Sequence, residues 1–220
     1  MKALNPKFFI LLPAVLLMAF TACAPSSRSE KKGDAGITVT PQAMQVGDII
    51  FHKSQSRQSK AIHEASESEW THVGILVSKN DEWYVAEAIG PVVSTKLADF
   101  INRGKDQEYK IYRFKHFDAK TMETKLIRAI KKQNKKYDIY FEFSDEKTYC
   151  SELVYKVMLA VTGHELGKVQ QFKDLKLDGP EMKDLIKRRL TDKGRELNPD
   201  EEIITPISQM IDANLVLIKE

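Results

Sequence analysis

One stretch, residues 147–163, constrains the fold of this chain more than any other. It reads KTYCSELVYKVMLAVTG, and from Cys150 onward the apolar residues recur at helical spacing. Gly163 supplies a C-terminal stop, and Thr148 or Tyr149 stands at the start. The pattern predicts a buried helix with Cys150 in its first turn, on the face that points into the core.

The position of Cys150 allows two interpretations. Unpaired N–H groups and the positive end of the helix dipole favour a thiolate over a thiol at a helix start. Free cysteine is, however, also among the most buried residue types, so Cys150 can equally be a small core residue. Position alone therefore leaves a nucleophile and a structural residue as competing hypotheses.

The N-terminus has the features of an export signal. Lys2 and Lys7 precede an apolar run at residues 8–20, which then meets Thr21, Ala22 and Cys23. A basic segment, an apolar segment of this length and small residues before a cut are typical of a secretory signal peptide. The run is shorter than the roughly 20 residues that a transmembrane helix needs.

Small residues directly before Cys23 resemble the lipobox of bacterial lipoproteins, although Phe20 stands where Leu is usual. The resemblance implies a signal peptide at residues 1–22, cleavage before Cys23, and diacylglycerol and acyl chains on that residue. Several chains anchor a protein stably, since each buried CH₂ contributes about 0.8 kcal/mol. We therefore expect a lipid-anchored protein of the bacterial cell envelope; an ordinary signal peptide cut nearby is the alternative. If two membranes are present, Ala24 favours the outer membrane, facing the periplasm.

Only two cysteines are present, and lipidation would use Cys23. Cys150 is then a lone thiol in an exported protein, where most cysteines are paired. Either the reactivity of the thiol or its deep burial has to explain why Cys150 is unpaired.

The remaining chain of about 200 residues suffices for one domain with a substantial core. Residues 23–44 are rich in Ser, Pro, Gly and charge and predict a flexible tether, so the folded domain is expected at 45–220. Of 34 Lys and Arg, 32 remain without Lys2 and Lys7, against 31 Asp and Glu. This near-neutral balance gives no argument for nucleic-acid binding. The basic run at 131–136 is interpreted as a solvated helix end. We expect a monomer without a cofactor.

Short strands and helices alternate along the domain, and no repeat is present. Strands are expected near residues 46–51, 71–77, 82–88, 91–95, 109–114, 137–143 and 215–218, and helices near 97–101, 118–133, 150–162 and 181–190, with a short helix inside the loop 54–69. Such a mixture in a single domain predicts an α+β fold.

Residues 71–88 predict a β-hairpin with turn residues at 78–81. If the turn is centred between Lys79 and Asn80, His72 lies directly opposite Glu87. Opposed Cβ atoms are about 5 Å apart, which allows a hydrogen bond between imidazole and carboxylate. A slip of one residue would break this pairing.

A thiol nucleophile needs a base in hydrogen-bonding reach, and the base gains from a third group that orients its ring. Cys150, His72 and Glu87 are the candidates for these roles, with His52 as the rival base. For His72 the alternative is a structural role, and for Glu87 it is a place on the solvent-exposed face of the hairpin. Tyr137 and Ser151 are candidate contacts to an oxyanion or substrate, and for Tyr137 a place at the edge of the core is the alternative.

Several short motifs occur in a specific order. They are VGDIIF at 46–51, THVGI at 71–75, VAEA at 85–88, YD at 137–138, YCSELV at 149–154 and ITP at 204–206. This ordered set resembles the permuted, NlpC-type papain-like hydrolases, and in particular the YaeF/YiiX group of predicted amidases and peptidases, which includes bacterial lipoproteins. In ordinary papain-like enzymes the cysteine comes first, and histidine before cysteine is the order that permutation produces.

The resemblance implies an antiparallel sheet packed against the helix that carries the cysteine. It places the nucleophile at Cys150, the base at His72 and the third member at Glu87. It also implies attack on an amide or ester carbonyl and an acyl-enzyme that water releases. Related folds cleave peptidoglycan peptides, and the permuted branch includes lipid-directed acyl hydrolases and transferases, so a peptide, peptidoglycan or N-acyl lipid substrate is expected.

Two other classes of function stay open. A non-catalytic envelope lipoprotein could bind lipid or peptide in the same cleft. The second class is a metal-binding protein with Cys150, His72 and Glu87 as ligands, although Cys-x-x-Cys and His-Glu-x-x-His spacings are absent.

Overall fold

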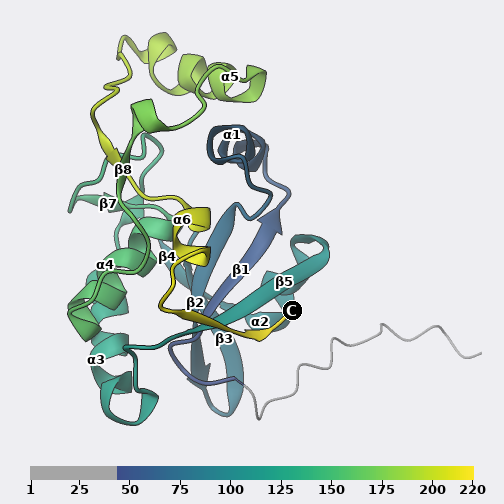
Figure 1. Ribbon diagram of the computed structural model, residues 1–220, viewed down its shortest axis with the longest axis vertical. Helices are drawn as coiled ribbons and strands as arrows, with labels where there is room; N and C mark the ends of the chain where they lie inside the picture. Colours follow the sequence, from purple (N-terminus) through teal and green to yellow (C-terminus); the bar gives the residue numbers. More distant parts are fainter. Residues whose placement is uncertain (1–43) are drawn as a thin grey trace, which may run out of the picture. The chain divides into compact units, whose positions relative to one another are not determined.

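The computed structural model describes residues 44–220, so the predicted signal peptide, Cys23 and the tether up to residue 43 lie outside the described residues. Six strands form one antiparallel sheet in the order β10-β5-β1-β2-β3-β4 (Figure 1). They are β1 (Ile49–Ser54), β2 (His72–Lys79), β3 (Glu82–Ala88), β4 (Val92–Lys96), β5 (Gly104–Phe114) and β10 (Leu215–Lys219). The α+β prediction with an antiparallel sheet is confirmed.

Five of the six α-helices within residues 44–220 lie where the sequence predicts a helix, and α6 lies where none was expected. They are α1 (Arg57–Ser66), α2 (Leu97–Asn102), α3 (Ala119–Lys132), α4 (Cys150–Thr162), α5 (Pro180–Arg189) and α6 (Pro206–Met210), with 3₁₀ turns η1 (Phe172–Asp174) and η2 (Thr191–Lys193). Short strand pairs join β6 (Lys136–Tyr137) to β7 (Lys147–Thr148) and β8 (Gln170–Gln171) to β9 (Glu202–Ile203). Within residues 44–220, none of the helices combines the length and the apolar character that a bilayer crossing needs.

Both faces of the sheet are covered, because side chains alternate along each strand. Ile49 and Phe51 of β1 face a core shared with α3 and α4, whose buried residues include Leu126, Leu153 and Val157. The opposite face packs against α2 in a second cluster. Figure 1 shows α4 running beside the sheet, where it packs on β2.

A third apolar cluster lies between α1 and α5 and does not include the sheet. Its members are Ala61, Ala65, Phe141, Tyr149, Tyr155, Phe172, Met182, Leu185, Ile203 and Ile204. Tyr149 belongs to this cluster, whereas Cys150 belongs to the core under the sheet. The start of α4 therefore stands where the two cores meet.

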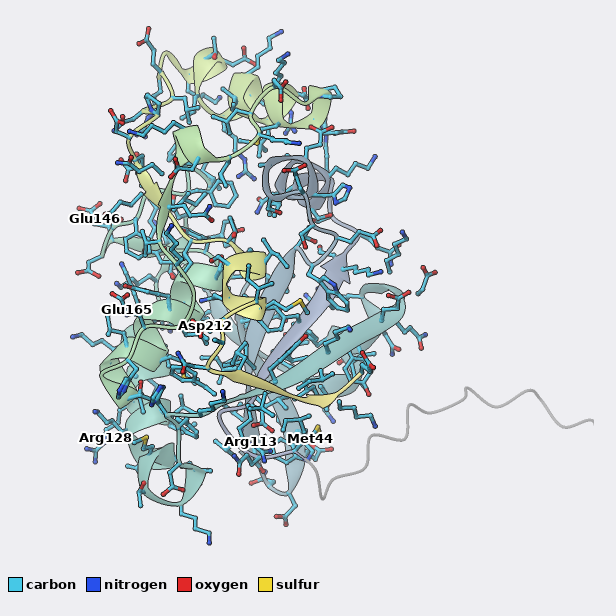
Figure 2. All side chains as sticks on the ribbon, in the orientation of Figure 1. Met44, Arg113, Arg128, Glu146, Glu165 and Asp212 are labelled. Atoms are coloured by element: carbon cyan, nitrogen blue, oxygen red, sulfur yellow. The ribbon has the colours of Figure 1, made fainter. Side chains whose placement is uncertain are left out.

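The VGD motif before β1 has a structural role. Asp48 is buried and binds the Arg113 guanidinium through both carboxylate oxygens, each at 2.8 Å (Arg113 is labelled in Figure 2). Gly47 has a φ of +88°, and a Cβ there would lie 2.2 Å from the Phe117 ring. The motif thus fixes the turn that starts the central strand.

The hairpin of β2 and β3 exists, but its register differs from the prediction. Ile75 pairs with Ala86 and Lys79 with Glu82, so the turn is centred between Asn80 and Asp81. Both turn residues have a positive φ, 52° and 61°, as a two-residue type I′ turn requires. Asn and Asp adopt this conformation more readily than the lysine that the predicted centre would have used.

The predicted strand at 137–143 is wrong beyond Tyr137. The Asp138 carboxylate accepts a hydrogen bond from the Tyr140 N–H at 2.8 Å, which turns the chain. Phe141 then has a φ of 59°, outside the range of a strand, and packs against Tyr149. The aromatic residues here serve the cluster under α1 and α5 rather than a sheet.

Candidate active site

The first turn of α4 is held by side chains that are distant in sequence. The Tyr149 hydroxyl accepts from the Ile204 N–H at 3.0 Å, and the Ser151 hydroxyl donates to the Ile204 carbonyl at 2.8 Å. Gln209 of α6 donates to the Ser151 carbonyl at 3.0 Å. These bonds anchor the helix start on which Cys150 stands.

This arrangement corrects the expectation for Ser151. Its side chain is buried, and its hydroxyl is used by the Ile204 carbonyl. The backbone N–H of Ser151, in contrast, favours the Cys150 thiolate and lowers the pKa of that thiol. The residue therefore contributes through its backbone.

The structure brings the side chains of Cys150, His72 and Glu87 together. His72 Nε2 lies 2.6 Å from Glu87 Oε2, and the His72 ring lies near enough to the Cys150 thiol to lower its pKa. Because Nε2 is used by Glu87, Nδ1 is the nitrogen left for the sulfur. The contact predicted between His72 and Glu87 is present despite the register difference, since a shift of two residues keeps both side chains on the same face.

Glu87 is fully buried and is held by more than His72. Thr95 Oγ1 of β4 donates to Oε1 at 2.5 Å, and Arg103 Nη2 lies 2.6 and 2.7 Å from the two carboxylate oxygens. A buried carboxylate needs such partners to remain charged. The network fixes the anion that orients the His72 ring.

The charges of Cys150, His72 and Glu87 stabilise one another. Burial raises the pKa of the Cys150 thiol, but the His72 charge and hydrogen bond and the N–H groups of Val73 and Ser151 outweigh this and lower it below its usual range. Burial lowers the pKa of His72, but the thiolate and Glu87 outweigh this and raise it to about 9. Burial likewise raises the pKa of Glu87, but His72, Thr95 and Arg103 bring it down to about 2. The arrangement favours a thiolate–imidazolium pair at neutral pH.

His52, the rival base, has a different role. It stands opposite His72 in the pairing of β1 with β2, and its Nδ1 donates to the Phe100 carbonyl at 2.9 Å. Burial and the neighbouring His72 charge lower the pKa of His52 to about 3. His52 is therefore a neutral ring stacked on Phe100 rather than a partner of the thiol.

Tyr137 lies at the edge of the same site. Its hydroxyl accepts from Gln58 Nε2 of α1 at 2.6 Å, and Gln58 Oε1 accepts from Arg189 Nη2 of α5 at 2.6 Å. A guanidinium can only donate, so Arg189 fixes which end of the Gln58 amide faces Tyr137. Burial raises the pKa of Tyr137 above its ordinary value, and the hydroxyl stays protonated. Because the hydroxyl oxygen accepts from Gln58, its own proton is left to donate.

A cleft of about 560 Å³ opens over Cys150, within the range of small-ligand sites. His72, Tyr137, Gln58, Arg103 and Arg189 line it. A separate apolar cavity of about 40 Å³ also reaches Cys150, between Phe141, Tyr149 and the α5 side chains. Cys150 thus borders both a large open cleft and a small apolar cavity.

The model of one protein family, described as permuted papain-like amidase enzyme, YaeF/YiiX, C92 family, matches residues 43–215. The chain belongs to this family. The family resemblance inferred from the ordered motifs is therefore confirmed, and with it the assignment to the papain-like amidase type of hydrolase.

Two relatives support the YaeF/YiiX assignment. The uncharacterized protein YiiX of Escherichia coli K12 is 36% identical over 163 residues, which cover 74% of this chain and 79% of that protein. A crystal structure of YiiX from Escherichia coli O157:H7 matches with a TM-score of 0.74 at 35% identity, over 80% of this chain and 97% of that one.

That crystal structure is titled as one of a metalloprotein. In residues 44–220 of the present family member, no group of three or more His, Cys, Asp or Glu side chains is arranged to hold a metal ion. The Glu87 oxygens are already taken by His72, Thr95 and Arg103. The residues at this site do not fit a metal.

Sequence reasoning did not identify Thr95, Arg103, Gln58 or Arg189 as parts of the site. Thr95 could have been found by extending the hairpin to a third strand, since Glu87 pairs with Val93 and Thr95 lies two residues further on the same face. The other three come from α1, α5 and the end of α2, and no local pattern places them together.

Proposed function

We propose that this chain is a cysteine amidase in which Cys150 is the nucleophile, His72 the general base and acid, and Glu87 the residue that orients His72. The observation that carries the proposal is the contact of His72 with a fully buried, charge-compensated Glu87, beside a thiol whose pKa the His72 charge lowers. A merely structural cysteine would need no such arrangement.

The reaction begins with attack of the Cys150 thiolate on the carbonyl carbon of an amide. The Cys150 N–H, which as the first N–H of α4 has no acceptor within its helix, and the Tyr137 hydroxyl are suited to donate to the oxyanion. The His72 imidazolium protonates the leaving amine as the C–N bond breaks. Neutral His72 then takes a proton from water, which attacks the thioester and releases the acid and the thiolate.

The size of the apolar cavity favours a peptide-like substrate over a long-chain lipid. A cavity of about 150 Å³ holds benzene, whereas the cavity beside Cys150 measures about 40 Å³ and accepts only a small aliphatic group. The open cleft accommodates the polar remainder of such a substrate. Peptide amides of the cell envelope are therefore the first substrates to test.

We further propose that the chain is anchored in the envelope through lipidated Cys23, a proposal that rests on the sequence of residues 1–23. Growth with an alkyne-tagged fatty acid in a bacterial host would label the wild type in the membrane fraction. The Cys23→Ala variant is expected to lose the label. Equal labelling of both would contradict the lipidation site.

The catalytic proposal is tested by incubating the domain with peptidoglycan fragments and with N-acyl amides and identifying products by mass spectrometry. Cys150→Ala and His72→Ala are expected to lower turnover at least about 10³-fold without changing the circular dichroism spectrum. His63→Ala, at an exposed histidine of α1, serves as the matched control. Turnover that survives in Cys150→Ala would contradict the proposal, and binding without products would favour a non-catalytic role.

A further inference from the structure

Arg189 of α5 is a half-buried guanidinium at the edge of the cleft with two neutral partners. Its Nη2 donates to Gln58 Oε1 at 2.6 Å, and its Nη1 donates to the Ile139 carbonyl at 2.7 Å. The guanidinium carbon also lies 5.5 Å from the centre of the Phe141 ring. These contacts hold the charge in place without neutralising it.

Five other arginines of the described chain differ in this respect, and Arg128, which likewise forms no ion pair within residues 44–220, does not line the cleft. Arg57 and Arg188 pair with Asp184, Arg103 with Glu87, Arg113 with Asp48 and Arg195 with Glu142. Arg189 forms no such ion pair within residues 44–220. Asp138 is near enough to interact electrostatically, but its Oδ1 accepts from the Tyr140 N–H and it does not hydrogen-bond to Arg189.

The charge of the cleft is consequently unbalanced. No Asp or Glu is among its lining residues. The Arg103 charge is offset by Glu87, and the His72 charge by the thiolate. The positive charge that remains is that of Arg189, which stays protonated at physiological pH.

Arg189 also has unused hydrogen-bonding capacity. A guanidinium carries five N–H donors, of which the Gln58 and Ile139 oxygens take two. Its planar fork matches the geometry of a carboxylate, and such charge-assisted bonds are about twice as strong as neutral ones. A substrate carboxylate would supply the counter-ion that the protein does not.

We propose that Arg189 binds a carboxylate of the substrate, so that the cleft selects acidic, peptide-like amides with an anionic group close to the scissile bond. This inference rests on the proposed cysteine amidase activity. We favour a carboxylate over the phosphate of a lipid headgroup, because the cavity beside Cys150 is too small for a long acyl chain.

Paired alkylating probes test the charge preference without knowledge of the natural substrate. N-chloroacetyl-glycine carries a carboxylate, N-chloroacetyl-glycinamide is its neutral counterpart, and N-chloroacetyl-phosphoethanolamine carries a phosphate. In each reaction the Cys150 thiolate forms a C–S bond to the methylene carbon while chloride leaves. Rates are followed by intact mass and divided by the rate of each probe with a free small thiol.

The wild type is expected to react about tenfold faster with the carboxylate probe than with the neutral one. Arg189→Gln should bring this ratio close to one, and Arg189→Lys should keep only part of it, because the fork is lost. Arg188→Gln is the matched control, since it removes the same charge one residue away on the same helix and should preserve the preference. The ratio within each variant is insensitive to a general loss of reactivity.

A wild-type ratio near one, or an unchanged ratio in Arg189→Gln, would overturn the inference while leaving the amidase proposal intact. A stronger preference for the phosphate probe would overturn the carboxylate assignment. Failure of every probe to alkylate Cys150 at neutral pH would contradict the proposed function and this inference with it.

Discussion

Glu87 Oε2 lies 2.6 Å from His72 Nε2, and the Glu87 side chain is fully buried. The carboxylate is held on its other side by Thr95 and Arg103. His72 is thereby presented to Cys150 with a fixed ring orientation and a raised pKa. Through this contact Glu87 raises the pKa of His72, and the His72 charge in turn favours the Cys150 thiolate.

Replacing Glu87 by Gln should move the alkaline limb of the activity profile to lower pH. Glu87 and the thiolate raise the pKa of His72 to about 9, so the imidazolium is lost as the pH rises through that value. Without the carboxylate, and with Arg103 left nearby, the pKa of His72 falls and the limb moves towards neutrality. We expect kcat/KM at pH 7 to drop about 10²-fold or more.

The pH profile of kcat/KM for Glu87→Gln measures both effects. Glu123→Gln, at an exposed residue of α3, is the control and should retain the wild-type profile. An unchanged alkaline limb in Glu87→Gln would show that Glu87 does not govern His72.

Folding stability should also respond to Glu87 in acid. Its pKa is about 2 in the folded protein against an ordinary value of 4.5, so the unfolded chain takes up the proton first. The stabilisation is complete above pH 4.5 and is lost as the pH falls from there towards 2. Urea unfolding at several pH values should therefore show a steeper acid loss for wild type than for Glu87→Gln. Parallel acid profiles would contradict the depressed pKa.

Gly74 permits the close approach of β2 and β3 beside Glu87. A Cβ there would lie 2.3 Å from Val85 Cγ1 and 2.9 Å from the Ala86 carbonyl oxygen. Gly74→Ala should lower the free energy of unfolding by about 1–3 kcal/mol and reduce activity by displacing Glu87. Gly90→Ala is the control, because no atom lies within 4 Å of its added Cβ. Equal urea midpoints for the two variants would refute this packing argument.

Tyr137→Phe keeps the ring and removes the hydroxyl donor. If the hydroxyl stabilises the oxyanion, kcat should fall about 10²–10³-fold with little change in KM. Gln58→Leu should cause a smaller loss, because Gln58 acts by orienting Tyr137. Tyr140→Phe, in the same loop, should behave as wild type. A loss confined to KM would instead assign Tyr137 to ground-state binding.

Local patterns predicted much of this fold. The apolar spacing after Cys150 and the stop at Gly163 predict the bounds of α4, and the helix expected near 118–133 is α3, which Asp118 caps. The predicted centre of the hairpin turn lies one residue too early, because the left-handed backbone of the turn falls on Asn80 and Asp81. The pairing of His72 with Glu87 survived because the shift kept both on one face.

Long-range packing set the limit of prediction. Gln58 and Arg189 come together only because α1 and α5 pack on one another, and their contact spans 131 positions of sequence. The aromatic run after Tyr137 has strand-like composition, yet burial under α5 and the Asp138 turn determine its backbone. Neither the contact between Gln58 and Arg189 nor the backbone after Tyr137 follows from a local repeat of apolar residues.

The rate at which iodoacetamide alkylates Cys150 at pH 6 tests the central claim most directly. Less than about 1% of an ordinary thiol is ionised at that pH, so reactivity there reports the thiolate–imidazolium pair. The domain from residue 45 onward contains no other cysteine, so its intact mass counts the modification. We predict that Cys150 reacts at least tenfold faster than free cysteine at pH 6 and that His72→Ala removes this advantage. A Cys150 that reacts no faster than free cysteine, with or without His72, would contradict the account.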